Sequence, residues 1–332
     1  MRGDWRMVVK TVTLYAVLFV PYALILTGWF SRPAMLGLTV IMGVGMAGLG
    51  FSVAHDALHG AYSERAWVNR LLGYSFDLLG ANGYMWKFTH NVVHHTYTNI
   101  QGVDGDLEVS PYLRLSPRSP YRPIHRYQHL YAFGAYSLST LVWVTIKDFK
   151  YFLSGENGPH RGRKLPPAEI ATLIGFKALY YTWVIAIPVI VLHLAWWEIL
   201  IGFLVFHLSA GIILGIVFQL AHVVEQTAHP TPTPSGAMEH AWLLHELETT
   251  ADFGQENRLL TWYVGGLNFQ IEHHLFPKVC SVHYPAISRI VRELAEKYNM
   301  PYHVNPTLRS AIASHVRVLR RLGQGATELS PA

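Results

Sequence analysis

Cysteine and charged residues are both scarce in this chain. One cysteine, Cys280, occurs among 332 residues, so an internal disulfide is excluded and nothing indicates an oxidising compartment. Charged residues make up 14% of the chain and hydrophobic residues 51%, whereas soluble domains usually carry about 25% charged residues. Together with a mean hydropathy of +0.22, this balance indicates a membrane protein rather than one or two soluble domains.

Two further features are missing. No small-residue cleavage site follows the first apolar run, so we interpret that run as a retained membrane segment and not as a removed signal peptide. No nucleic-acid-binding motif accompanies the net charge of +5, and the basic residues lie beside apolar segments, so no nucleic-acid partner is expected. The positive charge therefore indicates contact with a membrane surface.

Four apolar runs are long enough to cross a bilayer, which takes about 20 residues. They cover residues 11–30, 34–54, 178–194 and 197–221. Short linkers separate the first run from the second and the third from the fourth. The sequence therefore predicts an all-α integral membrane protein whose four transmembrane helices form two hairpins.

The distribution of basic residues predicts which face of the membrane holds the rest of the chain. With four spans, all of the 26 Lys and Arg residues except Arg32 lie on one face, as expected for the cytoplasmic side. We therefore expect a single domain, residues 1–332, with both termini cytoplasmic, a helical cap at 55–177 and 222–300, and a tail at 301–332. A fifth apolar stretch, 130–146, is predicted to be interfacial or re-entrant, because a fifth span would separate the two termini.

One segment of the cap has the pattern of an amphipathic helix. In ISRIVRELAEKY, which begins at Ile287, apolar residues recur at helical spacing with charged residues between them. The predicted apolar face carries Ile287, Ile290, Val291 and Leu294.

Histidines gather in three short motifs. HDALH covers residues 55–59, HNVVHH covers 90–95, and QIEHH covers 270–274. Helical spacings of three and four residues place side chains on one face, so each motif can direct two or three ligands toward one point. All three motifs fall on the same predicted side of the membrane, as does a further histidine at the end of the fourth span. The candidate metal ligands are His55, His59, His90, His94, His95, His222, His273 and His274, with Gln270 as a weaker ninth.

This number of ligands predicts two metal ions. A zinc site usually takes four ligands in all, and imidazole suits zinc, copper, iron and nickel alike, so ligand type alone does not name the metal. The Glu-x-x-His pattern of soluble di-iron bundles is absent, so any di-iron site would be of a histidine-rich kind. Carboxylates near the motifs are candidates for orienting the imidazoles, namely Asp56, Asp104, Asp106 and Glu272.

The three motifs resemble the histidine boxes of the membrane fatty acid desaturases. The similarity runs from about Val12 to Tyr298 and includes FQLAHVVE around His222 and LNFQIEHHLFP around the third box. The third box begins with Gln270, where the animal acyl-CoA desaturases have histidine, so it most resembles the front-end branch and related acyl-lipid or acyl-CoA enzymes. The resemblance implies an O2-dependent desaturase with two non-haem iron ions, held by the eight histidines named above.

The resemblance also implies partners and a location. The substrate would be a fatty acyl chain of a lipid or acyl-CoA, and the protein would lie among membrane lipids, in a bacterial inner membrane. The chain has no His-Pro-Gly-Gly haem motif, so electrons are expected from a separate cytochrome b5-like or ferredoxin-like carrier. An apolar tunnel would position the acyl chain, with Trp86, Phe88, Tyr97, His245, Trp262 and Phe269 as candidate lining residues.

Two other functions remain open at this point. Membrane hydroxylases of acyl or alkyl chains use related histidine boxes, and no residue in the sequence separates them from desaturases. A membrane metal-binding or transport protein is the second alternative, although transport predicts ionisable residues inside the spans, and the histidine motifs lie at or beyond the span ends.

Overall fold

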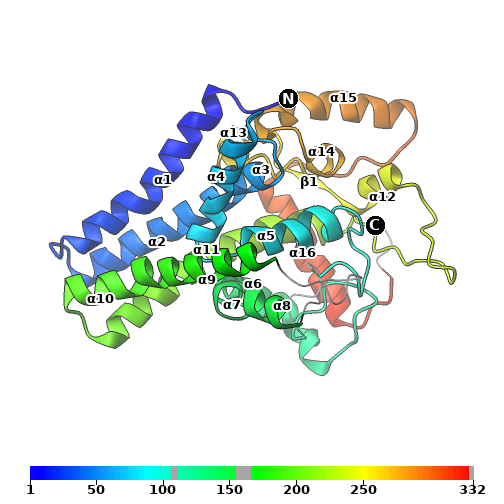
Figure 1. Cartoon of the computed structure of the whole chain (residues 1–332). Coiled ribbons are helices and arrows are strands. Elements are labelled where there is room, and N and C mark those ends of the chain that lie inside the picture. The colour runs from blue at the N-terminus through cyan, green and yellow to red at the C-terminus, as the bar shows by residue number, and fades with distance from the viewer. Residues whose placement is uncertain (106–110, 155–165, 329–332) are drawn as a thin grey trace.

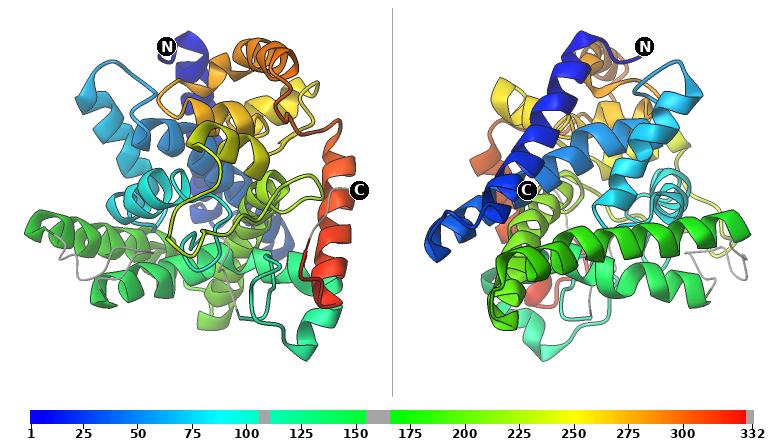
Figure 2. Two further views of the ribbon diagram at one scale, coloured as in Figure 1. Left: turned by 90° about the vertical axis from the view of Figure 1, so that its right-hand side faces the viewer. Right: turned by 60° about the vertical axis from the view of Figure 1, so that its left-hand side comes forward.

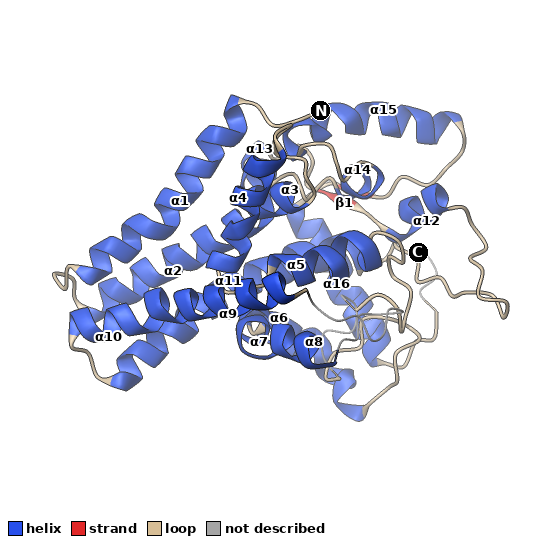
Figure 3. Cartoon of the chain, in the orientation of Figure 1, coloured by secondary structure: helices blue, strands red, loops and turns tan. Residues whose placement is uncertain are grey.

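The computed structural model describes residues 1–105, 111–154 and 166–328. This part of the chain is mostly helical, with two short strands (Figure 3). Within it, four helices are long and apolar enough to cross a membrane. The prediction of an all-α fold with four candidate spans is therefore confirmed.

The four candidate spans form two antiparallel hairpins. The first hairpin joins α1 (Trp5–Leu26) to a continuous helix, Arg32–Leu58, which consists of α2 (Arg32–Leu49), the π-helical turn η1 (Gly50–Ala54) and α3 (His55–Leu58). The second joins Pro167–Leu192, which consists of α9 (Pro167–Tyr181), η5 (Thr182–Ala186) and α10 (Ile187–Leu192), to α11 (Trp196–His222). The third span thus begins at Pro167 rather than at residue 178.

The helices α2 and α11 run parallel to each other, from a shared salt bridge at one end to predicted metal ligands at the other. Both begin beside a salt bridge between Arg32 and Glu198, whose Nε and Oε1 atoms lie 2.6 Å apart. Both end beside predicted metal ligands, since His55 follows η1 and His222 is the last residue of α11. The continuous helix Arg32–Leu58, which α2 begins, and α11 each have 27 residues, so the histidines lie about 40 Å from the hairpin turns. The turns project to the left in Figure 1, and the rest of the chain gathers at the other end.

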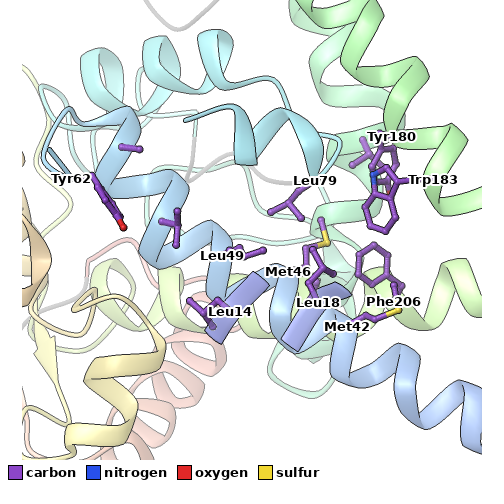
Figure 4. Close-up of a cluster of buried hydrophobic side chains, with 14 of the residues drawn as sticks. Leu14, Leu18, Met42, Met46, Leu49, Tyr62, Leu79, Tyr180, Trp183 and Phe206 are labelled. Atoms are coloured by element: carbon purple, nitrogen blue, oxygen red, sulfur yellow. The ribbon is translucent and has the colours of Figure 1, made fainter. Parts of the chain in front are cut away.

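The bundle core lies between the two hairpins. In the most apolar window of the Arg32–Leu58 helix 61% of the residues are buried, against 22% in each of the other three spans, so this helix is the central one. Leu18 of α1, Met42 and Met46 of α2, Trp183 of η5 and Phe206 of α11 meet in one cluster (Figure 4). Their burial holds the two hairpins together in the absence of any disulfide.

The fifth apolar stretch is broken into short pieces. It forms α6 (Gln128–Ser137), α7 (Ser139–Val142) and the π-helical η4 (Trp143–Lys147), followed by α8 (Asp148–Ser154), and it is not among the candidate spans of the described residues. Gly211 of α11 lies so close to the end of α6 that a Cβ atom at this position would collide with the carbonyl oxygen of Ser137. The buried Lys177 of α9 forms an ion pair with Asp148 of α8 at 2.8 Å. The stretch therefore packs against the bundle, as expected for a segment that does not cross it.

The remaining elements cover the histidine end of the bundle (Figure 2). Between the hairpins they are α4 (Ala66–Leu78), α5 (Gly83–Trp86), η2 (Lys87–His94) and η3 (Pro123–Tyr127). After α11 they are α12 (Trp242–Thr249), β1 (Asp252–Phe253), α13 (Arg258–Tyr263), α14 (Gln270–Leu275), η6 (Ser281–His283), α15 (Tyr284–Lys297), β2 (Val304–Asn305) and α16 (Leu308–Gly323). The strands β1 and β2 pair in parallel.

The prediction of a tail from residue 301 is wrong for most of that segment. Helix α16 begins at Leu308, and its Val318, Leu319 and Leu322 are fully buried against Tyr136 and neighbouring residues. The hydroxyl of Tyr136 and Nε2 of His315 share a hydrogen bond of 2.9 Å. The reason for the error is physical: the buried face of α16 includes the polar Ser314 and His315, and the burial of His315 depends on its contact with Tyr136 of α6.

The predicted amphipathic helix exists, but its apolar face is divided. In α15 the residue Val291 is buried, whereas Ile290 and Leu294 are 59% and 45% exposed. The buried side of the helix is completed by small residues and Tyr284.

Candidate metal centre

The first histidine motif extends a transmembrane helix. The π-helical turn η1 precedes His55, and His59 caps α3 with a backbone hydrogen bond to the His55 carbonyl of 3.0 Å. Their ring centroids are 4.6 Å apart. Both side chains are buried, so the helix carries them directly from the bilayer end into the interior of the cap.

The second histidine motif lies on a π-helix and not on an α-helix. The backbone amide of His95 donates to the carbonyl of His90, five residues earlier, at 3.1 Å. In such a turn, residues at i, i+4 and i+5 share one face, so His90, His94 and His95 all point inward. The ring centroids of His90 and His95 lie 4.8 Å apart. The π-helical turn therefore brings the three imidazoles of this motif onto one face more completely than the expected α-helix would.

The third motif is held in place by a carboxylate and a glycine. Asp252 accepts a hydrogen bond from the backbone amide of Ile271 at 3.0 Å and so satisfies a donor in the first turn of α14. Gly265, in the loop before α14, has φ +64° and lies directly against the backbone of Phe51 in η1. This contact fixes the third motif against the helix that carries the first.

The histidine at the end of α11 completes the cluster. The carbonyl of His222 accepts a hydrogen bond from the Asn99 side chain at 2.9 Å, so the loop after the second motif holds the end of the fourth span. The His222 ring lies 4.7 Å from that of His94 and 5.0 Å from that of His274.

All eight predicted histidines meet in overlapping groups. In each group the candidate ligand atoms lie within 4.8 Å of one another, and every member is buried. His95 and His273 stand between the two ends of the cluster, with ring centroids 4.6 Å apart. The groups are His55, His59, His90 and His273; His94, His222 and His274; and His95, His273 and His274. Two separate groups joined by a third are the arrangement expected of a site for two metal ions.

The donors in the cluster fit metal ions. Burial lowers the pKa of His95, His273 and His274 well below its usual value, and neighbouring imidazoles lower it further, so these rings are neutral, as metal ligands must be. Their Nε2 atoms, and that of His59, are buried and have no hydrogen-bond partner among the residues that the structure describes. Buried polar atoms are rarely left unsatisfied, and coordination of metal ions would satisfy these.

Comparison with known proteins identifies the family. Residues 30–306 match the family described as "Fatty acid desaturase". The chain belongs to the fatty acid desaturase family. It is 35% identical to the sn-1 linoleoyl-lipid 6-desaturase of Synechocystis sp., covering 97% of this chain and 90% of the relative. It is 36% identical to the enzyme of the same name from Arthrospira platensis, covering 85% and 76%, and 33% identical to an acyl-lipid (8-3)-desaturase of Physcomitrium patens, covering 96% and 66%.

Two carboxylates orient imidazoles of the desaturase. Asp104, as predicted, lies 3.0 Å from Nδ1 of His94 and also accepts from the backbone amide of Asn99. The other is Glu246, whose Oε2 lies 2.7 Å from Nδ1 of His274. Glu246 was not among the predicted residues, and the one available signal was its place next to His245 in HELETTADF. A carboxylate at Nδ1 directs Nε2 toward the metal site.

The other predicted carboxylates do not orient imidazoles in this way. Asp56 accepts hydrogen bonds from Cys280 and from the amide and hydroxyl of Ser281, and it lies 3.8 Å from Nδ1 of His55. Glu272 accepts from Tyr302 at 3.0 Å and lies beside Asp252; burial raises its pKa. Asp106 lies outside the described residues. Asp56 and Glu272 therefore hold the loops around the desaturase site, and a role for them in orienting imidazoles stays a prediction.

The predicted tunnel residues separate into four groups. Trp86 stacks on His90 with ring centroids 4.3 Å apart and meets the edges of His55 and His59, so it forms a wall of the metal site. His245 is bonded through Nε2 to the carbonyl of Thr98 at 2.9 Å and has a supporting role. For Phe88, which is buried, and Tyr97, which is half-buried, a role in the tunnel stays a prediction. The last two, Trp262 and Phe269, line a separate pocket.

Gln270 is buried at the start of α14. It is 3% exposed, and its amide oxygen accepts no hydrogen bond from the described residues. Direct coordination and contact with a bound water molecule both fit this environment. A role as a ligand stays a prediction.

Glu246→Gln is expected to weaken the metal site while preserving the fold. The amide is nearly the same size as the carboxylate but cannot hold the His274 ring as strongly, so metal affinity and activity should fall by about 10- to 100-fold. Metal content after dialysis against a graded chelator measures the effect. Glu248→Gln is the matched control, because Glu248 pairs with the exposed His240 at 2.8 Å. Equal metal retention in the two variants would contradict this role for Glu246.

Proposed function

We propose that this desaturase uses two iron ions and O2 to introduce a double bond into a fatty acyl chain esterified in a membrane lipid. The observation that supports the proposal most directly is the convergence of eight buried histidines in two groups at the end of four apolar helices. We assign His55, His59, His90 and His273 to one ion and His94, His222 and His274 to the other, with His95 between them.

The need for metal follows from the substrate. A methylene C–H in an acyl chain has no acidic proton and no leaving group, so acid–base side chains cannot open it. Iron, when bound, would supply the oxidising power for the removal of two hydrogens from adjacent carbons. The chain itself supplies imidazoles on four elements and keeps those of His94 and His274 in place through Asp104 and Glu246.

The chain also keeps bulk water from the reacting carbons. The imidazoles and the wall formed by Trp86 are nearly fully buried, and the helices that carry them rise directly from the membrane. Exclusion of water protects a strong oxidant from side reactions. Because an acyl chain offers few polar groups, shape must determine which carbons lie beside the metals.

The form of the substrate is inferred from the relatives. Two of them are named sn-1 linoleoyl-lipid 6-desaturases, and another is named an acyl-lipid (8-3)-desaturase. We therefore infer that the acyl chain is attached to a lipid, that it already contains a double bond, and that the new one is placed closer to its carboxyl end.

Electrons and orientation belong to the same proposal. We infer that a separate small carrier, cytochrome b5-like or ferredoxin-like, delivers the electrons. The excess of Lys and Arg at the histidine end supports a cytoplasmic position for the active site and both termini, in a bacterial inner membrane.

The test is expression in a bacterial host that lacks polyunsaturated lipids but incorporates supplied linoleate into its membranes. We expect a new double bond at carbon 6 of lipid-bound chains, mapped by mass spectrometry of the fragmented lipids. Hydroxylated chains without new double bonds would show instead that the enzyme is a hydroxylase. Zinc in the purified protein, together with no O2-dependent product, would support the metal-binding or transport alternative.

A further inference from the structure

A second pocket lies at the histidine end of the molecule, outside the metal centre. It has a volume of about 550 Å³ and lies between the beginning of α1, the segment around α13, and one face of α15. These segments meet at the top of Figure 1. Neither the histidine motifs nor the proposed reaction assigns it a role.

The floor of this pocket carries a buried lysine. Lys10 lines the pocket and is only 4% exposed. Its ammonium lies 5.9 Å from the centroid of the Trp262 ring, and among the described residues no oxygen accepts a hydrogen bond from it. The nearby carboxylate of Asp56 is already bonded to Cys280 and Ser281. Buried ammonium groups are almost always paired with an anion. The charge of Asp56 acts on Lys10, but a hydrogen-bond acceptor for its ammonium would have to come from a ligand in the pocket.

The rim of the pocket adds exposed charge of both signs. Arg6 is paired with Asp4 at 2.8 Å, and Arg292 donates to Gln255 at 2.7 Å, so these two guanidinium groups are already engaged. Arg258 and Arg289 also line the rim, as do three glutamates, Glu256, Glu293 and Glu296. Exposed charges are screened by solvent and salt. The electrostatic potential inside the pocket is therefore positive mainly because of the buried Lys10 at its floor.

The pocket opens beside surfaces suited to lipid. On α1, the helix that carries Arg6 and Lys10, the apolar Trp5 and Val9 are 73% and 51% exposed. This helix is also one of the four candidate membrane spans, and exposed apolar side chains at the end of a span suit the headgroup region of a bilayer. A membrane lipid can therefore place its headgroup near Lys10 without leaving the bilayer.

The pocket shares part of its wall with the segments that carry the metal ligands. Its lining includes Ser281, whose hydroxyl donates to Asp56 at 2.8 Å, and Asp56 is adjacent to His55. It also includes Phe269, which caps α14, the helix that carries His273. A headgroup held there would lie at the same end of the molecule as the metal centre.

We propose that this pocket binds the phosphate-bearing headgroup of the lipid substrate, with Lys10 as the principal cationic contact. This inference rests on the proposed function, which it extends from an acyl-lipid to a phospholipid. Lys10 acts as a binding residue that holds the substrate at its polar end, and the double bond forms elsewhere.

The test measures lipid binding independently of turnover. The full-length protein in a neutral detergent is mixed with two short-chain lipids of equal chain length, dihexanoyl phosphatidylglycerol and an uncharged dihexanoyl galactolipid, and bound lipid is counted by native mass spectrometry. We expect the phospholipid to bind at least about tenfold more tightly, the effect of one charge-assisted hydrogen bond. In Lys10→Met this preference should disappear, and in Lys10→Arg it should persist.

Control variants separate this effect from a general loss of charge or of folding. Lys150→Met removes an exposed lysine of α8 in the same way and should leave the preference unchanged. Arg289→Gln, on the exposed rim, should weaken the preference for the phospholipid about threefold. This variant replaces Lys10→Met as the test if Lys10→Met does not fold. Unaltered preference in both Lys10→Met and Arg289→Gln would overturn the proposal, as would equal binding of the two lipids by the unmodified protein.

A further arm distinguishes a lipid headgroup from free phosphate. Millimolar inorganic phosphate should leave phospholipid binding unchanged, because the exposed apolar side chains of α1 also hold the acyl chains. Complete displacement would show that the pocket is a site for free phosphate and would overturn the lipid assignment. A failure to form double bonds in the host experiment would leave these binding results intact, so the two proposals can fail separately.

Discussion

His94→Ala is expected to abolish double-bond formation while leaving the protein in the membrane. His94 belongs to the group that contains His222 and His274, so its loss leaves that group with two of its three imidazoles. Loss of an orienting residue alone costs about 10- to 100-fold, and loss of a ligand should cost at least about a thousandfold. Double bonds per enzyme molecule in the host membranes measure the effect, and the iron content of purified protein should fall from two ions toward one.

The control for this variant is His240→Ala. His240 is exposed and pairs with Glu248 outside the cluster, so its loss should change neither iron content nor activity. Both variants should appear in the membrane fraction in amounts similar to those of the unmodified protein. Substantial activity in His94→Ala would rule out His94 as a ligand, whereas loss of protein from the membrane would point to a structural role.

Gly265→Ala is expected to disrupt the site without touching any ligand. Gly265 has φ +64°, and a Cβ atom would lie 2.5 Å from the carbonyl oxygen of Phe51 and 2.8 Å from Cα of Ser52. Left-handed backbone costs about 1–2 kcal/mol for a residue with Cβ, and overpacking adds about 1–3 kcal/mol. Because neither contact can move without shifting η1, the third motif should be displaced from the first. Thermal unfolding and iron content measure the two consequences.

A second glycine distinguishes the collision from the backbone strain. Gly28, in the first hairpin turn, has φ +71° and would place a Cβ atom in open space. Gly28→Ala should therefore lower stability only by the backbone cost and leave iron content unchanged. If the two variants lost iron equally, the contact between the third motif and η1 would not be what holds the site together.

Much of this molecule could be predicted from its sequence because the signals are local. A run of apolar residues identifies a span regardless of its neighbours, and histidines at fixed spacing identify a motif. Counting the spans between the motifs predicted that His55, His94 and His274 share one side of the membrane, and the structure brings their groups together.

The parts that escaped prediction depend on contacts between distant segments. Glu246 looks like any other glutamate until α12 is placed beside His274. In the sequence, Lys10 looks like an exposed basic residue beside a span. Its burial becomes apparent only from the segments that surround it in the structure. The buried position of α16 depends on α6, and the π-helical turns before and within the histidine motifs have no recognised sequence signature.

The parallel helices that begin at the Arg32–Glu198 salt bridge also limit how this fold can evolve. One residue inserted into either helix would advance its terminal histidine by about 1.5 Å and rotate it by about 100°. His55 or His222 would then no longer face the cluster, while the salt bridge would still hold the other ends together. Insertions and deletions should therefore accumulate in the connections between elements, and the lengths of these two helices should be inherited together.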